Sequence, residues 1–432
     1  MVIGRLARVF GTAMGALVAV VVTVGTASAQ FIPTPEASIP ERQSVLQRAR
    51  PDYDPLGIQA GSFLILPSMD LQEWWDSNVF AVPTRPSSDT VTAVVPQLSV
   101  ASDWNNHALN LFVGDQSLFY NKHTTENTNN VTVAAQGRFD IQRDEYIEAG
   151  AGLQLSHEDR SSPDASVSGK YPTQFTVADG NIGFVRNIGI IGASITGDVQ
   201  SYSYNNNVTN ADVEIPEAYR DYIQYTVTPR VTYEIVPGYH AFIQTPLNER
   251  QYDRGVDPSG FNHSSHGYEG DVGTAINLGS ALNGEVFIGY LRQDYEDSAF
   301  ATAQGLSGGA NLLWNVTDLT SVRVSITRVV EEEAAGVTNG TSGSYLETTG
   351  NLSVEHELLR NVLLTGGATY FVDQFTGVNR TDNNYNAYLG AKYLMNRVLS
   401  LGVNANYWHR DSNQPGVNYD REIIGVKLHL QL

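Results

Sequence analysis

The sequence predicts an all-β protein that folds as a closed antiparallel barrel of about 18 strands across a membrane. Apolar and polar residues alternate over segments of about 10 to 14 residues, longer than the usual strand of about five or six. Short and long polar breaks separate these segments in strict alternation. Helix-period patterns are nearly absent after Gly57, where glycine, asparagine, threonine, valine and tyrosine become abundant.

Composition excludes several classes of protein. The chain has 432 residues, of which 41% are hydrophobic and 17% charged, so it can bury a large apolar surface and is expected to fold. Its formal net charge of −20 argues against a nucleic-acid partner, because phosphate binding needs clustered lysine and arginine. The absence of cysteine excludes a disulfide framework, a thiolate metal site and a cysteine nucleophile.

The first 29 residues have the pattern of a cleaved secretory signal peptide. Arg5 and Arg8 precede an apolar run that extends to Val24, and the small residues 27–29 form a cleavage site before Gln30. No later stretch approaches the roughly 18 apolar residues that a spanning helix needs. If the mature chain crosses a membrane, strands must carry it across.

Residues 30–56 contain five prolines and many charges, which predicts an extended periplasmic lead. The barrel is expected to occupy residues 57–432. Within it, the alternation is clean in segments such as 147–155, 223–233, 385–393 and 399–407. In the last of these, the apolar set is Leu399, Leu401, Val403, Ala405 and Tyr407, opposite Ser400, Gly402, Asn404 and Asn406. Segments 91–100 and 172–185 are ambiguous.

Short polar breaks divide the alternating runs into hairpins. They occur near Asp103, Arg143, Asn187, Pro237, Ser280, Thr317, Arg360 and Asn396. Eight turns join sixteen strands, and further strands at about 60–76 and 419–432 make eighteen, with sixteen the nearest alternative. An even count places both ends of the barrel on the periplasmic side, as in bacterial outer-membrane barrels. A β-propeller would need four short strands per repeat, and a β-sandwich would not need alternating loop lengths.

The last strand, REIIGVKLHLQL, resembles the signal that the outer-membrane assembly machinery recognises, although Leu432 stands where that pattern favours an aromatic residue. The segment from Arg50 to Pro83 resembles the opening of a family of alphaproteobacterial β-barrel porins. The resemblance continues in GYLRQDYED, SVEHELLRNVLL and YLMNRVLSLGVNANYWHRDSN. It implies a barrel in the bacterial outer membrane, surrounded by lipid and lipopolysaccharide. Because some members are associated with exopolysaccharide export, it also implies polysaccharide as a possible partner.

No pattern for catalysis, for a cofactor or for a metal ion is present. The sequence has no GxSxG nucleophile elbow. His263 and His266 lie three apart in a loop without further ligands, and the acidic runs 294–297 and 331–333 lack the spacing of a calcium loop. We therefore expect a protein that is not an enzyme, and an outer-membrane hydrolase remains the least favoured alternative.

The expected function is a porin-like channel for small polar solutes or for polysaccharide export, because a barrel of 16 to 18 strands is wide enough for a water-filled lumen. The pore-lining candidates, chosen as charged residues on the polar face, are Asp140, Glu148, Asp198, Arg220, Arg230, Glu234, Glu269, Asp271, Glu285, Arg323, Glu347, Glu355, Asp373, Lys392 and Lys427. Together with Arg138 they comprise ten acids and six bases, which predicts a preference for cations or neutral sugar-like solutes.

Two questions about this face stay open at the level of sequence. Opposite charges could instead pair across neighbouring strands and brace a barrel that has no conductance. Tyr222, Tyr388 and Trp408 share the polar face and could either stack on sugars or pack against a plug.

Overall fold

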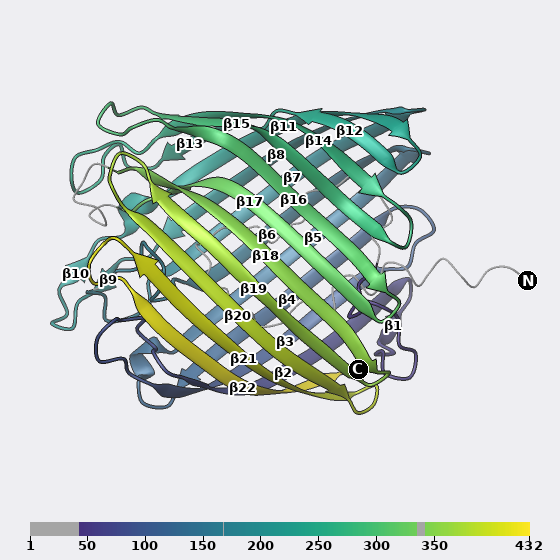
Figure 1. Cartoon of the computed structure of the whole chain (residues 1–432), viewed down its shortest axis with the longest axis horizontal. Helices are drawn as coiled ribbons and strands as arrows, with labels where there is room; N and C mark the ends of the chain where they lie inside the picture. The colour runs from purple at the N-terminus through teal and green to yellow at the C-terminus, as the bar shows by residue number, and fades with distance from the viewer. Residues whose placement is uncertain (1–42, 167, 335–341) are drawn as a thin grey trace, which may run out of the picture.

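The computed structural model describes residues 43–166, 168–334 and 342–432, and these form one closed barrel (Figure 1). The continuous sheet contains 20 labelled segments. One of them, β1 (Ile58–Ala60), is a short extension that pairs only with β2 (Phe63–Asp76). Two others are halves of one strand, so the wall has 18 strands, and the predicted number is confirmed. Every wall strand is antiparallel to its neighbours, and β22 (Tyr419–Gln431) closes the ring on β2 through nine residue pairs, Ser68↔Gln431 to Asp76↔Ile423.

The remaining wall strands follow each other around the ring in chain order. They are β3 (Asp89–Ser102), β4 (Ala108–Tyr120), β5 (Thr128–Gln142), β6 (Glu145–His157), β7 (Gln174–Ile188), β8 (Ile191–Tyr204), β11 (Tyr222–Val236), β12 (Tyr239–Gln244), β13 (Leu247–Tyr252), β14 (Ser265–Asn277), β15 (Leu282–Tyr295), β16 (Ala303–Thr317), β17 (Thr320–Glu332), β18 (Ser344–Leu359), β19 (Val362–Phe375), β20 (Thr381–Leu394) and β21 (Leu399–Ser412).

Segments β12 and β13 are one strand interrupted at Pro246. Both halves pair with β11 in the same register, with Arg230 opposite Gln244 and Val227 opposite Leu247. Proline has no N–H to give to the ladder, which explains the break. The carbonyl of Pro246 still accepts a hydrogen bond from the Glu269 N–H at 2.8 Å, so the wall continues across the interruption.

The connections alternate between short turns and longer loops. All eight predicted turns fall at the short connections or within two residues of them, for example at residues 143–144, 237–238 and 360–361. Gly238 has a φ of +88°, a backbone conformation that glycine adopts at little cost. The longer loops contain two helical turns, η1 (Thr124–Glu126) and η2 (Ala218–Arg220), and a small ribbon of β9 (Asn207–Val208) with β10 (Glu214–Ile215). Among the described residues, no helix is long and apolar enough to cross a membrane.

The two faces of the wall differ as the alternation predicts. On the outer face, Leu352 is 48% exposed and Leu389 71% exposed. Exposed aromatic residues such as Tyr268, Tyr370 and Tyr407 lie toward the loop ends of their strands, at the position of an interfacial girdle. Lipid therefore contacts an apolar band bounded by aromatic rings.

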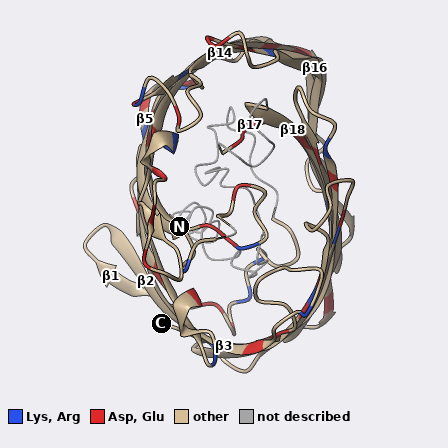
Figure 2. Ribbon diagram, turned by 90° about the vertical axis from the view of Figure 1, so that its left-hand side faces the viewer, with Lys and Arg blue, Asp and Glu red and all other residues tan. Residues whose placement is uncertain are grey.

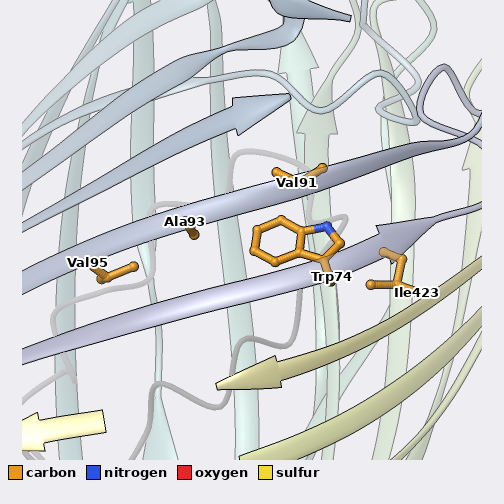
Figure 3. Packing of buried hydrophobic residues seen from close by; sticks show 5 residues of the cluster. All are labelled: Trp74, Val91, Ala93, Val95 and Ile423. Carbon is orange, nitrogen blue, oxygen red and sulfur yellow. The ribbon is translucent and has the colours of Figure 1, made fainter. Parts of the chain in front are cut away.

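The two ambiguous segments are the strands β3 and β7, with apolar residues on both faces. The ladder between β3 and β4 is interrupted at Val95 and Pro96. On β3, Val91, Ala93 and Val95 point inward and are buried with Trp74 and Ile423 (Figure 3). On β7, Phe175 and Val177 are buried on the inner face in the same way. Alternation is weak here because the inner wall near the loop end is covered by protein rather than by water.

Candidate functional site: the lumen and the chain folded into it

The register places almost every pore-lining candidate on the inner face. Each candidate on a strand shares the parity of the inward residues of that strand, as Glu269 and Asp271 do with buried Ser265 and Gly267 on β14. Arg220 is the exception, because it lies in η2, ahead of the start of β11. There it pairs with Glu158 at 2.5 Å and with Glu217 at 3.4 Å. The sequence analysis expected this strand to include Arg220, whereas β11 begins at Tyr222.

Some inward charges brace the wall. Arg230 on β11 pairs with Glu285 on β15 at 2.8 Å, and its guanidinium lies 3.7 Å from the centre of the Phe242 ring. Arg138 and Asp140 pair at 2.8 Å along β5. Between the first and last wall strands, Lys427 and Asp70 pair at 2.5 Å. Three of the six predicted bases, Arg138, Arg230 and Lys427, therefore pair with carboxylates of the wall.

The remaining acids outnumber the remaining bases. Within the described chain, Arg323 and Lys392 make no ion pair. Among the acids, Asp271 accepts hydrogen bonds from neutral donors, Gln244 at 3.0 Å and Ser307 at 2.8 Å. One buried carboxylate oxygen of Glu148 has no hydrogen-bond partner in the part of the chain that is described. The inner wall keeps an acidic excess after its internal pairing is complete.

Three acids stand in one row near the loop end of the lumen. The register aligns Glu347, Asp373 and Asp382 across β18, β19 and β20. Asp382 is neutralised by Arg380 at 2.6 Å, and Asp373 accepts a hydrogen bond from the Asn384 amide at 3.2 Å. Since like charges directly opposite each other are destabilising, this row is a place where a mobile cation would relieve repulsion.

The first part of the loop between β6 and β7, residues 158–166, folds into the barrel and reaches the far wall. Arg410 on β21 donates to the Ser161 carbonyl at 2.7 Å. Arg421 on β22 pairs with Asp159 at 3.3 Å and with Asp76 at 2.7 Å. Burial works to raise the pKa of Asp159, but Arg421 and the Ser161 hydrogen bonds outweigh it, so that this pKa lies below its usual value. Figure 2 shows loop segments with charged residues inside the barrel outline.

The same loop contacts a second region of the chain. Asp164 accepts a hydrogen bond from the Ala334 N–H, beyond the end of β17, at 3.0 Å. Burial raises the pKa of Asp164 to about 6, although Arg220 acts in the opposite direction. Residues 158–166 thus connect β21 and β22 with the end of β17 on the loop side of the lumen.

Residues 43–56 occupy part of the other mouth of the barrel. The sequence predicts an extended lead here, whereas the described part of it turns back against the inner wall. Val45 is fully buried against Leu363 and Leu394. Arg50 pairs with Glu357 at 2.8 Å, with both side chains buried. Burial of Val45 and pairing of Arg50 hold these residues on the wall, which their proline and charge content did not indicate.

The inward aromatic residues are mostly packing residues. Tyr222 stacks between Tyr202 and Tyr252, with ring centroids 4.6 and 5.1 Å apart. Trp408 is 3% exposed, in a cluster with Phe371 and Tyr419. Tyr222 and Tyr388 are both half-buried on the inner face, but the faces of the Tyr222 ring are taken up by the two neighbouring tyrosines. The packing alternative therefore holds for Tyr222 and Trp408.

Sequence reasoning missed several inward charges. On β2, Asp70 and Asp76 alternate with outward residues, and this pattern could have revealed them. Asp159 and Asp164 carry no such signal, because a loop that folds inward looks the same in sequence as one that extends into solvent. Their role follows only from contacts with strands far along the chain.

A closed barrel with an apolar outer band and a charged interior defines an outer-membrane β-barrel of the channel-forming kind. The family model described as putative beta-barrel porin 2 matches residues 50–432, and the chain belongs to that family. The protein is a porin-like channel of the bacterial outer membrane, where lipid and lipopolysaccharide surround it. A search of curated proteins found no match to the chain.

Three of the solved structures to which the chain is similar come from Pseudomonas. The siderophore receptor PirA from Pseudomonas aeruginosa is 9% identical, with a TM-score of 0.44, and the match covers 89% of this chain and 81% of that chain. A BenF-like porin from Pseudomonas fluorescens Pf-5 is 10% identical, with a TM-score of 0.44 and coverage of 85% and 99%. OccK2 (OpdF) from Pseudomonas aeruginosa is also 10% identical, with a TM-score of 0.44 and coverage of 85% and 98%.

Proposed function

We propose that the channel passes small polar solutes and favours cations and neutral sugar-like molecules over anions. The observation that carries this proposal is the acidic excess of the inner face after pairing, represented by Glu148, Asp198 and the Glu269–Asp271 pair. Carboxylates on a pore wall attract cations and repel anions. The pore-lining residues are the inward candidates on the strands, without Arg220.

In this proposal, the loop that contains residues 158–166 narrows the lumen and so limits the size of the solute that can pass. A wall of 18 strands is wide enough for an aqueous channel, and the loop narrows it. Arg410 and Arg421 are engaged by loop and wall acceptors. They hold the loop in place and leave the acids elsewhere on the wall to face the solute.

Planar bilayer recordings test the selectivity. Reversal potentials in a potassium chloride gradient should show cation preference for the wild-type channel and a reduced preference for the double variant Glu269→Gln, Asp271→Asn. Glu73→Gln is the matched control, since Glu73 is an exposed acid on the outer face of β2. Anion selectivity of the wild type would refute the electrostatic argument, and absence of conductance would favour the alternative of a structural barrel.

The proposal also covers the export of the chain, its assembly and its lack of catalysis. Residues 1–29 are removed as an export signal; they lie outside the described residues. The assembly machinery recognises β22, whose outward residues Ile424 and Val426 are 55% and 57% exposed. The channel has no catalytic role. Polysaccharide passage is the weaker candidate, because Trp408 is buried and Tyr222 is stacked between Tyr202 and Tyr252, which leaves Tyr388 of the three proposed stacking residues.

A further inference from the structure

The hydrogen-bonded wall is interrupted between β16 and β17. Strand β16 pairs with β15 as far as Ala303↔Gln293, and β17 pairs with β18 as far as Glu332↔Ser344. Pairing between β16 and β17 stops at Ala310↔Ile326. Residues 303–309 and 327–332 therefore border each other without a ladder, and we name this interruption the seam. Since lipid offers no hydrogen bonds to a strand edge, such an interruption needs a specific cause.

The cause is an inward displacement of the end of β17. Arg250, on the inner face of β13, donates to the Val330 carbonyl at 2.8 Å and pairs with Glu332. The hydroxyls of Tyr252 and Tyr295 donate to Glu332, each at 3.3 Å. Glu332 has lipid-facing parity, so its contacts with inward side chains place this end of β17 inside the neighbouring wall. Figure 2 shows it there, apart from β16.

Burial on the next strand agrees with this displacement. Leu346 on β18 lies opposite Val330 in the register and also has lipid-facing parity. It is only 9% exposed, whereas Leu352, further along the same face of β18, is 48% exposed. The loop ends of β17 and β18 are therefore covered on their outer face, whereas lipid contacts the same face nearer the short turns.

The lipid side of the seam is apolar and partly flat. Leu306 on β16 is 68% exposed and Ile326 on β17 is 44% exposed. Between them, the next outward residue of β16 is Gly308, which presents no side chain. The register places Leu306 opposite Tyr290, one of the exposed aromatic residues near the loop end. This surface suits an acyl chain at the level where lipid headgroups begin.

A cation without a carboxylate partner completes the site. Arg328, on the outer face of β17, makes no ion pair with any described residue, and its buried Nε has no hydrogen-bond partner there. Its Nη2 lies 3.5 Å from the Gln374 side-chain oxygen and 4.0 Å from the position that a Gly305 Cβ would occupy. Arg292 on β15 differs, because it forms a two-pronged pair with Asp294 at 2.7 and 2.8 Å.

We propose that the seam binds the phosphorylated glucosamine lipid of lipopolysaccharide, with a phosphate on Arg328 and an acyl chain along Leu306 and Ile326. A planar guanidinium with free donors matches phosphate oxygens. The seam opens in the extracellular half of the wall, which faces the leaflet that contains lipopolysaccharide. This proposal is independent of what the lumen conducts.

Binding of purified lipid A to the detergent-solubilised full chain tests the headgroup. Arg328→Gln should weaken binding by about tenfold or more, the value of one charge-assisted contact. The control Arg292→Gln should stay within about twofold of the wild type, because its guanidinium is already neutralised. Dephosphorylated lipid A and phosphatidylglycerol should both bind less tightly than lipid A. Equal affinity of Arg328→Gln and wild type, or full binding of the dephosphorylated lipid, would overturn the proposal.

Photo-crosslinking tests the position of the acyl chain. The sequence has no cysteine, so a benzophenone can be attached at a single introduced thiol. Leu306→Cys and Leu389→Cys form a matched pair, since the native side chains are 68% and 71% exposed on the same outer face. Position 306 should capture lipid A several times more than position 389, and the difference should vanish with Arg328→Gln. Equal capture from both positions contradicts a specific site. Heat-modifiable gel migration confirms that each variant is folded.

Discussion

Unequal costs of one substitution at two adjacent residues should distinguish the two faces of the wall. Leu352 and Asn351 are neighbours near the middle of β18. Leu352 lies among Val324 and Ala368 on the lipid face, whereas Asn351 donates a hydrogen bond to Thr369 at 2.7 Å on the inner face. Each is replaced by arginine, so that the same side chain enters lipid in one variant and the lumen in the other.

The expected costs follow from these positions. An arginine on the lipid face near the midplane costs about 2 to 4 kcal/mol, or roughly 30- to 700-fold in the folding equilibrium constant. Asn351→Arg removes one hydrogen bond, worth about 1 kcal/mol, and leaves the new charge near water and carboxylates. The free energy of unfolding is measured by urea titration in lipid vesicles, followed by tryptophan fluorescence. Equal destabilisation by both variants would refute the assignment of faces.

Three other predictions concern the lumen. Asp164→Asn should abolish a pH dependence of conductance. The pKa of Asp164 is raised from 3.8 to about 6, so its neutral form favours the docked loop. This stabilisation of the docked loop is fully present below the pKa of 3.8 of the undocked carboxyl and is lost as the pH rises through about 6. Wild-type conductance should therefore rise over that range in single-channel recordings, and a pH dependence that survives in the asparagine variant would exclude Asp164 as its source. Val45→Asp should release residues 43–56 from Leu363 and Leu394 and raise conductance. The control Ala49→Asp, at an exposed residue, should leave conductance unchanged. Equal conductance of both variants would mean that this segment does not obstruct the mouth. Arg230→Gln should leave Glu285 without its 2.8 Å partner and increase cation preference, measured as reversal potential; an unchanged value would place Glu285 outside the ion path.

The strands and turns could be predicted because their causes are local. A strand with one face in lipid and one in water must alternate, as residues 399–407 do. A two-residue turn between long strands needs polar or glycine residues at that point, as at residues 143–144 and 237–238. Alternation was ambiguous at β3 and β7, where Val91 and Phe175 are inward but covered by other parts of the chain.

The site could be predicted only as a list of inward charges. Parity placed Glu148, Asp198 and Asp271 on the inner face without any knowledge of the fold. The partners that neutralise a charge depend on contacts between distant segments, such as Arg421 with Asp159, which are 262 residues apart. The inward fold of residues 158–166 and of residues 43–56 depends on the same kind of contact, which a pattern of neighbouring residues does not contain.

The contacts of residues 158–166 also have a consequence for the order of assembly. This loop belongs to the first half of the chain, whereas Arg410 and Arg421 lie on the last two strands. The loop therefore cannot complete its contacts until those strands have joined the sheet, and a partly assembled barrel keeps the loop accessible. Protease sensitivity of residues 158–166 during assembly should disappear only when β22 pairs with β2. Early protection would show that the loop docks without them. Once docked, the loop acts as a strut between opposite walls and resists flattening of the barrel under lateral pressure from the membrane.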